Sequence, residues 1–258
     1  MTSSGRLAAW RGIARSLAVY RLDRRHRASL TRFAGTFVRP GDLVFDIGAH
    51  VGDRTAAFAG IGAKVVAVEA QPRLARLLRW QFRRSRRVTV VGAAVGRTAG
   101  TLSLRLNTRN PTVASASEGF VAAAGAGAAG WEGQVWDATI TVDCTTLDEL
   151  IARFGRPAFV KIDVEGFEAE VLAGLSPEYA PEALSFEFVT MDRAPALQAL
   201  QEAVRLGYAG FDVSLGESHE WVFGERQTAE ALEAYLQDLP EAANSGDVYG
   251  WRGASRRL

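Results

Sequence analysis

The residues best suited to chemistry lie in a glycine-containing loop. An apolar segment runs up to Asp46 and is followed by Gly48 and Gly52, and a second apolar segment, 65–68, ends directly before Glu69. In a Rossmann-type half-domain, glycines let the backbone approach a nucleoside closely. An acid after the second strand accepts hydrogen bonds from the ribose hydroxyls. This spacing therefore predicts a nucleoside-binding site.

The same spacing narrows the choice of ligand. The pattern D-x-G-x-x-x-G from Asp46 to Gly52 differs from the G-x-G-x-x-G of dinucleotide-binding proteins, in which the glycine-rich turn receives a pyrophosphate. A nucleoside without a pyrophosphate is therefore expected, and S-adenosylmethionine (SAM) is the first candidate. Further along the chain, Gly92, Ala93 and Ala94 are small enough to admit a flat adenine after the third strand.

A second group of charged residues ends a later apolar strand, at 158–163. Lys161, Asp163 and Glu165 alternate with apolar residues, so they lie on one side of this strand. Three charges at the end of a buried strand cost free energy unless they are paired or used in chemistry. Two alternatives remain: a Lys161–Asp163 pair that only stabilises the strand end, or a catalytic group to which Glu187, near the end of the next strand, also belongs.

The elements that would hold these residues alternate along the chain. Hydrophobic periodicity and turn residues predict strands at 43–47, 64–69, 88–91, 101–106, 139–143, 158–163, 183–188, 209–214 and 219–224. They predict helices at 53–60, 72–84, 166–174, 195–206 and 227–237, and a further helix that begins at the capping box 146–149. The last two strands are too close for a helical crossover, so we expect an antiparallel hairpin. Residues 114–130, rich in Ala, Gly and Ser, are predicted to be a mobile loop that acts as a lid.

This alternation predicts an α/β protein with a mostly parallel sheet and helices on both faces. A seven-stranded sheet with one antiparallel strand is the Rossmann-like architecture of class I SAM-dependent methyltransferases. We expect a helical N-terminal appendage at 1–39, a methyltransferase domain at 40–240 and a frayed polar C-terminal tail at 241–258.

Composition excludes several other classes of protein. The chain has 258 residues and 48% hydrophobic content, enough to bury a full core. Cys144 is the only cysteine, which excludes an internal disulfide and a multi-cysteine metal site. Arginines interrupt every apolar run in residues 1–40, and no segment reaches the ~20 apolar residues of a membrane span. We therefore expect a cytoplasmic protein with no transmembrane segment.

Positive charge is concentrated in two places although the net charge is only +1. Residues 1–39 hold nine arginines against Asp23 alone, and the stretch from Arg73 to Arg87 holds seven arginines and no acid. Such clusters either meet an anionic partner, such as nucleic acid, a phosphorylated glycan or a membrane surface, or form solvated helix faces. Composition alone leaves both alternatives open.

Four motifs in order resemble the FkbM family of SAM-dependent methyltransferases. They are Phe45-Asp46-Ile47-Gly48-Ala49 with Gly52, Val68-Glu69-Ala70-Gln71-Pro72, Thr146-Leu147-Asp148-Glu149-Leu150, and Lys161-Ile162-Asp163-Val164-Glu165-Gly166-Phe167-Glu168. Together they extend over well over half of the chain. Members of that family are O-methyltransferases that act on hydroxyls of sugars, glycolipids and polyketide-type natural products. The sequence departs from the family pattern at His50, where Asn is usual, and at Ala70, where Pro is common.

The resemblance implies a SAM-dependent O-methyltransferase and assigns roles to particular residues. The implied cofactor-binding residues are Asp46, Gly48, Ala49, His50, Gly52, Glu69, Ala70, Ala93 and Ala94. The expected catalytic residues are Asp163, Lys161, Glu165 and Glu187. Among these we favour Asp163 or Glu187 as the base that takes the proton of the acceptor hydroxyl, with Lys161 orienting a carboxylate or stabilising a developing alkoxide. A divalent metal on Asp163, Glu165 and Glu187 is conceivable, but no metal is expected because no tightly spaced His/carboxylate cluster is present.

Three rival functions fit the sequence less well. A dehydrogenase would need the missing G-x-G-x-x-G and a Tyr-Lys or His-Asp pair. An RNA or other nucleic-acid methyltransferase using the arginine-rich N-terminal helices would need an aromatic stacking platform. A non-catalytic scaffold disagrees with intact Asp46, Glu69 and Asp163. The expected partner is therefore a small-molecule, glycan-linked or lipid-linked hydroxyl acceptor and not nucleic acid, while a homo-oligomer stays open.

Overall fold

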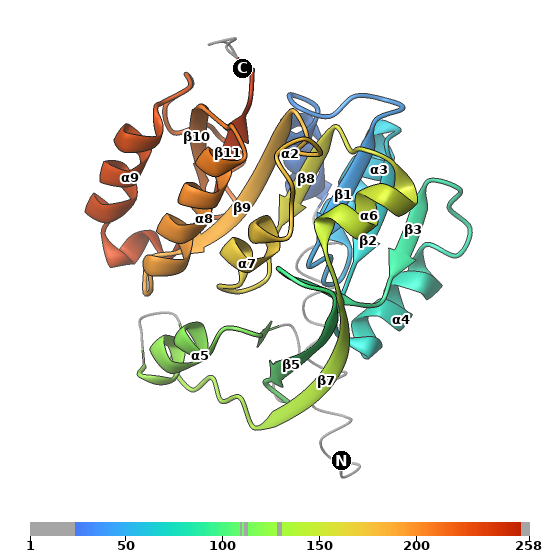
Figure 1. Ribbon diagram of the computed structural model, residues 1–258, viewed down its shortest axis with the longest axis horizontal. Helices are drawn as coiled ribbons and strands as arrows, with labels where there is room; N and C mark the ends of the chain where they lie inside the picture. Colours follow the sequence, from blue (N-terminus) through green and yellow to red (C-terminus); the bar gives the residue numbers. More distant parts are fainter. Residues whose placement is uncertain (1–23, 109, 111–112, 128–130, 254–258) are drawn as a thin grey trace.

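A seven-stranded sheet forms the framework of the computed structural model, which describes residues 24–108, 110, 113–127 and 131–253 (Figure 1). The strand order is β10-β11-β9-β8-β1-β2-β3. The strands are β1 (Leu43–Ile47), β2 (Lys64–Val68), β3 (Val88–Val91), β8 (Phe159–Ile162), β9 (Ala183–Val189), β10 (Gly210–Leu215) and β11 (Ser245–Trp251). β11 runs antiparallel to both of its neighbours, β9 and β10, and every other pair of adjacent strands is parallel. The predicted Rossmann-like sheet with one antiparallel strand is therefore confirmed.

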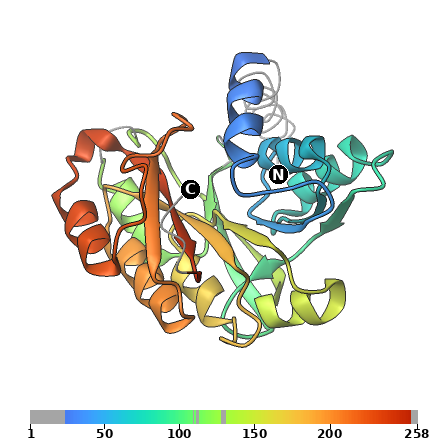
Figure 2. The same cartoon turned by 90° about the horizontal axis from the view of Figure 1, so that it is seen from above.

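Helices cover both faces of this sheet (Figure 2). One face packs against α2 (Arg24–Ala34), α3 (Asp53–Ile61) and α4 (Pro72–Gln81). The other packs against α6 (Leu147–Phe154), α7 (Glu168–Ala173), α8 (Ala194–Arg205) and α9 (Ala229–Asp238). The part of the expected N-terminal appendage before residue 24 lies outside the described residues. Among the described residues, no helix has both the length and the apolar character needed to cross a membrane.

Two-sided burial explains why the inner strands are continuously apolar. In β2, Val65 and Ala67 pack on the side of α3 and α4, while Val66 and Val68 pack into the core under α6, α7 and α8. A parallel strand with helices on both sides has no solvent-facing positions, so the polar/apolar alternation of half-exposed strands is lost. This leaves the carboxyl ends of the strands as the place where polar side chains gather.

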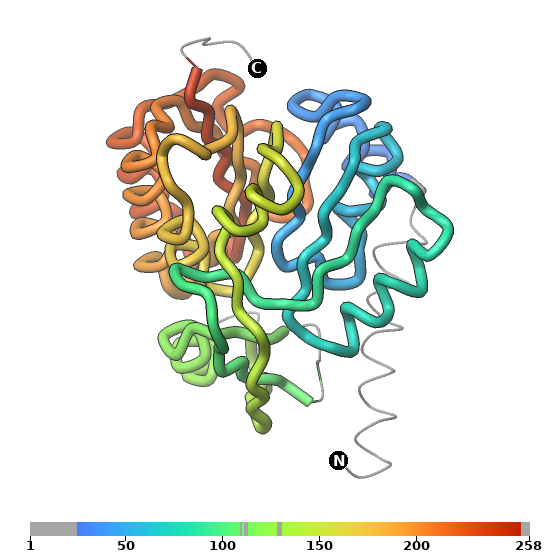
Figure 3. The backbone as a smooth tube through the Cα atoms, turned by 45° about the vertical axis from the view of Figure 1, so that its right-hand side comes forward, coloured from blue at the N-terminus to red at the C-terminus, as the bar shows by residue number. Residues whose placement is uncertain are grey.

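A second, smaller sheet lies beyond those carboxyl ends (Figure 3). Its order is β4-β7-β5-β6, from β4 (Ala94–Val95), β7 (Ala138–Thr145), β5 (Gly100–Leu106) and β6 (Ala114–Ser115). β5 and β7 pair antiparallel along their lengths. The expected strands at 101–106 and 139–143 therefore belong to a separate wall facing the main sheet.

The prediction of a mobile loop at 114–130 is wrong for the residues of this stretch that the structure describes. They form β6 and the helix α5 (Glu118–Gly125). The Ser117 hydroxyl caps this helix by accepting from the Phe120 N–H at 3.2 Å. Phe120 is fully buried and lies edge-on against Trp131 and Trp136. In the sequence, an Ala- and Gly-rich stretch separates Phe120 from Trp131 and Trp136, so the packing of these rings gives no periodic pattern from which the helix could be predicted.

The hairpin expected at 209–224 and the tail expected after 240 also need correction. Residues 219–224 are not a strand, and the carboxylate of Asp212 holds them as a turn by accepting from the N–H groups of Phe223 and Gly224. The chain then continues through α9 and a short 3₁₀ helix, Glu241–Ala243, to β11, which inserts between β9 and β10. The polar residues of β11 concealed this strand, because Asp247 is buried only through ion pairs with distant residues.

We expect the integrity of the main sheet to require β11. A chain that ends at Leu239 leaves β9 and β10 without their common partner and removes the buried residues Val248 and Tyr249. It should show no cooperative thermal transition by circular dichroism, whereas a chain that ends at Gly253, which keeps every described strand, should melt like the full chain. Native-like melting of the shorter chain would contradict the conclusion that the main sheet requires β11.

Candidate active site

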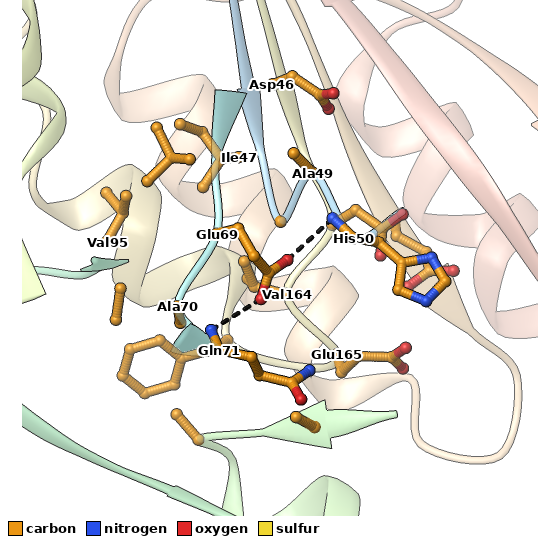
Figure 4. A pocket seen from close by; sticks show the side chains of 18 of the residues that line it. Asp46, Ile47, Ala49, His50, Glu69, Ala70, Gln71, Val95, Val164 and Glu165 are labelled. Carbon is orange, nitrogen blue, oxygen red and sulfur yellow. Dashed lines mark hydrogen bonds between the residues drawn. The ribbon is translucent and has the colours of Figure 1, made fainter. Parts of the chain in front are cut away.

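A cavity of about 390 Å³ lies between the carboxyl ends of the main strands and the second sheet (Figure 4). Every predicted site residue except Gly52 lines it. These residues are Asp46, Gly48, Ala49, His50, Glu69, Ala70, Ala93, Ala94, Lys161, Asp163, Glu165 and Glu187. The tertiary structure thus brings together the ends of β1, β2, β8 and β9, which is the usual ligand position in an open α/β sheet.

Gly48 allows the two charged loops to touch. Its φ is +80°, and a Cβ placed on it would lie 1.7 Å from the carbonyl oxygen of Asp163. No side chain fits in that space, so only glycine lets the loop after β1 lie directly on the loop after β8. The N–H groups of Gly48 and Ala49 both donate to the Val68 carbonyl, at 2.9 and 3.0 Å, which fixes the loop over the end of β2.

Gly52 acts behind the cavity. It is the left-handed residue before α3, and a Cβ there would lie 2.7 Å from Leu78 and 2.9 Å from Phe82 of the α4 region. The residue therefore sets how closely α3 approaches α4. Gly52 was expected from the sequence to shape the ligand pocket directly. In the structure it does not line the cavity, and its contribution is indirect.

Glu69 is held by backbone donors on both of its oxygens. Oε2 accepts from the His50 N–H and Oε1 from the Gln71 N–H, each at 2.8 Å (Figure 4). Burial raises the pKa of Glu69 to about 7, and the two N–H groups oppose that rise. Since each carboxylate oxygen can accept more than one hydrogen bond, the oriented group can still accept from two hydroxyls of a diol.

Asp46 offers a buried acceptor at the end of β1. The Thr55 hydroxyl donates to its Oδ2, while its Oδ1 has no hydrogen-bond partner among the described residues. Burial raises the pKa of Asp46, against the opposing effects of the Thr55 hydrogen bond and the Lys161 charge. A buried carboxylate oxygen without a partner is costly, and the ammonium group of a methionine moiety would relieve that cost. The chemistry of this end of the cavity therefore fits SAM.

Lys161 lies in a buried ion-pair network. Its Nζ is 2.6 Å from Asp163 Oδ2 and 3.8 Å from Asp247 Oδ1, and Asp247 is also 3.5 Å from Arg54. Burial alone would raise the pKa of Asp163, but the Lys161 charge and the hydrogen bonds with Glu187 and Lys161 together lower it. The Lys161–Asp163 pair weighed from the sequence thus exists, and both residues also face the cavity.

Three carboxyl groups converge beside that pair. Oxygens of Asp163, Glu165 and Glu187 lie within 4.8 Å of one another. Burial and the negative charge of Asp163 raise the pKa values of Glu165 and Glu187 well above the usual range. Asp163 therefore favours its ionised form, whereas Glu165 and Glu187 hold a proton more strongly than ordinary carboxyl groups do. Such a group can exchange a proton with a bound hydroxyl, and its oxygens are also the type of ligand that a hard divalent cation prefers.

The loop that carries Glu165 is held in a strained shape from two sides. Glu165 has φ +56°, a left-handed conformation that is rare outside glycine. The buried Glu168 carboxylate accepts from the N–H groups of Val164 and Gly166 at 3.0 and 3.2 Å. From the second sheet, the buried Ser115 hydroxyl donates to the Glu165 carbonyl at 2.6 Å. These contacts fix the backbone from which the Glu165 side chain enters the cavity.

The backbone of His50 helps to build the site. Its N–H orients Glu69, and its φ of +51° places it in the left-handed region. Asn and His are both enriched in that region relative to most residues, which explains how His can replace the usual Asn of the resemblance. Burial lowers the pKa of His50 to about 4, so its imidazole is neutral at pH 7.

Some residues that line the cavity were missed in the sequence. Arg54 lies 3.2 Å from Glu217 and 3.1 Å from His219, more than 160 positions away. Glu217 lines the cavity, whereas His219 packs behind it. The apolar wall from the second sheet was missed as well; it includes Leu102, Leu104, Val113 and Trp131. The one local signal was the position of Arg54 in the first turn of α3, two residues after Gly52.

Comparison with known proteins agrees with this geometry. The Methyltransferase FkbM domain matches residues 46–191, more than half of the chain. No curated protein matches this chain in sequence.

Solved structures share the fold at low sequence identity. A TehB-like SAM-dependent methyltransferase from Corynebacterium glutamicum is similar with a TM-score of 0.50 and 11% identity, covering 97% of this chain and 99% of that one. For precorrin-6y C5,15-methyltransferase from Geobacter metallireducens, the TM-score is 0.46 and the identity 12%, and the match covers 88% of this chain and 87% of that one. For Aeropyrum pernix fibrillarin, in complex with SAM, the TM-score is 0.44 and the identity 12%, and the match covers 83% of this chain and 68% of that one.

The matched domain contains the loop after Asp46, Glu69 and the charged end of β8, the three parts that build the cavity. SAM is thus the cofactor of this protein, and the activity is methyl transfer. The chain belongs to the FkbM family of SAM-dependent methyltransferases.

Proposed function

We propose that this methyltransferase transfers the methyl group of SAM to a hydroxyl of a sugar, glycolipid or related natural product. The observation that carries the proposal is the group of three carboxyl side chains, Asp163, Glu165 and Glu187, beside the cofactor-binding loop. A sugar hydroxyl has a high pKa and needs help in losing its proton as the new bond forms. A set of carboxyl groups with unequal pKa values can supply that help.

The cavity divides into two halves in this proposal. Asp46 and Gly48 hold the methionine end of the cofactor, Glu69 holds its ribose, and the small residues Ala93 and Ala94 leave room for the adenine. Bound SAM supplies a methyl group activated by the sulfonium. The acceptor then occupies the half between the carboxyl groups and the apolar wall of the second sheet, which suits a small-molecule, glycan-linked or lipid-linked hydroxyl.

Glu187 is the better candidate for the base. Lys161 keeps Asp163 ionised and lowers its pKa, which makes Asp163 a weak proton acceptor. The raised pKa of Glu187 makes its ionised form a stronger base. Asp163 then positions the hydroxyl, and the Lys161 ammonium balances the negative charge that develops as the proton leaves.

Replacement of Glu69 should weaken cofactor binding. Glu69→Gln keeps the shape of the side chain but loses its charge and one accepting oxygen, so we expect a Kd for SAM about 100-fold higher by isothermal titration calorimetry. Glu220→Gln, the same change at an exposed position, should leave the Kd unchanged. If Glu69→Gln melts normally and binds SAM as the unchanged protein does, the ribose role is wrong.

SAM binding should also depend on pH through Glu69. Its pKa of about 7 lies above the ordinary value, so the carboxyl group gains its charge between pH 6 and pH 8. Only the ionised group leaves both oxygens free to accept from a diol, and the affinity should rise about tenfold between about pH 6 and about pH 8. The rise should disappear in Glu69→Gln. An unchanged pH dependence in that variant would assign the titration to another group.

The acceptor class can be tested with methyl-labelled SAM and a panel of sugars, glycolipids and hydroxylated lactones. Mass spectrometry and NMR of the product should locate the new methyl group on oxygen. Glu187→Gln should lower the rate about 100- to 1,000-fold, while the Kd for SAM stays unchanged because Glu187 lies in the acceptor half. Glu202→Gln on α8 serves as the control. Methylation only at nitrogen or carbon would refute the hydroxyl proposal.

A further inference from the structure

One face of α4 carries positive charge that the active site does not use. Seven arginines lie in this helix and the turn after it, and all seven are exposed: Arg73, Arg76, Arg79, Arg83, Arg84, Arg86 and Arg87. No acidic residue occurs anywhere from position 70 to position 117. The charge on this face is therefore not balanced by neighbours in the sequence.

Ion pairs do not balance it either. Within the described residues, no salt bridge involves the arginines at 76, 79, 83, 84, 86 or 87. Other exposed arginines of the same fold do find partners: Arg97 pairs with Glu170, and Arg105 with Glu118. The α4 face thus differs from an ordinary solvated surface of mixed charge.

A tryptophan lies in the middle of this charge. Trp80 is 63% exposed, the highest value among the exposed large apolar side chains in the described part of the chain. The guanidinium carbon of Arg83 lies 4.9 Å from its ring centroid, and Arg83 also donates to the Trp80 carbonyl at 2.7 Å. The opposite side of α4 is anchored in the core by Leu74 and Leu78. The core contacts therefore fix the outward direction of the tryptophan and its neighbouring arginines.

We propose that this α4 face, defined by Arg76, Arg79, Trp80, Arg83 and Arg84, docks on the surface of an anionic lipid bilayer. Each arginine near such a surface gains free energy from the negative headgroups. An indole prefers the boundary between headgroups and acyl chains, where its ring leaves water and its N–H stays hydrated. Charge and tryptophan together match this environment, and the helix lies at the outer edge of the fold (Figure 1).

A single-stranded nucleic acid is the competing partner, and the face suits it less well. Such binding relies on several aromatic rings on which successive bases stack. Among the described residues of this face, Trp80 is the one exposed aromatic ring, and Arg83 already lies over it. A bilayer needs only one interfacial anchor together with diffuse charge. This proposal is independent of which acceptor is methylated.

The test uses the full chain and co-sedimentation with vesicles. We expect binding to vesicles of phosphatidylcholine mixed with phosphatidylglycerol, release by added salt, and no binding to phosphatidylcholine alone. Arg76→Gln combined with Arg83→Gln should weaken binding about 30-fold. Trp80→Ala should weaken it about tenfold. Unchanged SAM binding by each variant will show that the fold is intact.

A matched control tests whether vesicle binding depends on this face or only on the net charge of the whole chain. Arg39→Gln combined with Arg153→Gln removes the same charge from exposed positions elsewhere, and Arg153, like Arg83, lies over an aromatic ring. The affinity of this control for vesicles should stay within about threefold of the affinity of the unchanged protein. The proposal is overturned if the control loses as much as the α4 variants, if neither vesicle is bound, or if a single-stranded RNA oligonucleotide binds in place of the anionic vesicles.

Discussion

The buried ammonium of Lys161 is the interaction on which the rest of the active site depends. A charge taken out of water costs several kcal/mol unless close partners compensate it. Lys161 is 3% exposed, and its partners come from two parts of the chain: Asp163 from its own strand end and Asp247 from β11. The ion pair therefore joins the chemistry at the end of β8 to the strand that completes the main sheet.

The electrostatics of the acceptor half follow from that pair. Burial, and then the negative charge of Asp163 that Lys161 helps to maintain, disfavour further negative charge on Glu165 and Glu187, and the pKa values of both rise. The three neighbouring carboxyl groups thus have unequal pKa values. Environments that push the pKa values of neighbouring groups apart are the usual way in which a site separates its acid from its base.

The two halves of the cavity are built by different means. The cofactor half relies on backbone groups: the N–H donors of His50 and Gln71 orient Glu69, and Gly48 brings the two loops into contact. The acceptor half relies on side chains and on a wall that belongs to another sheet. Ser115 connects the second sheet to the main sheet, because its hydroxyl holds the strained loop that carries Glu165. A change in the position of the second sheet would therefore also move a carboxyl group of the site.

The sequence by itself determined the features that depend on neighbouring residues. The glycine loop after Asp46, the acid at Glu69, the Thr146 cap of α6 and the order of most strands and helices follow from local turn chemistry and periodicity. The motifs also contained nearly every residue that lines the cofactor half, because that half is built from the ends of consecutive apolar strands.

Only the tertiary structure decided the features that depend on distant partners. β11 was concealed because Asp247 is tolerated in a strand only where Lys161 and Arg54 are close. Helix α5 was concealed because Phe120 finds its aromatic partners across a glycine-rich stretch. The contact of Arg54 with Glu217 and the pKa values of the carboxyl groups likewise arise from burial and from charges brought together by the fold, which no local pattern of residues records.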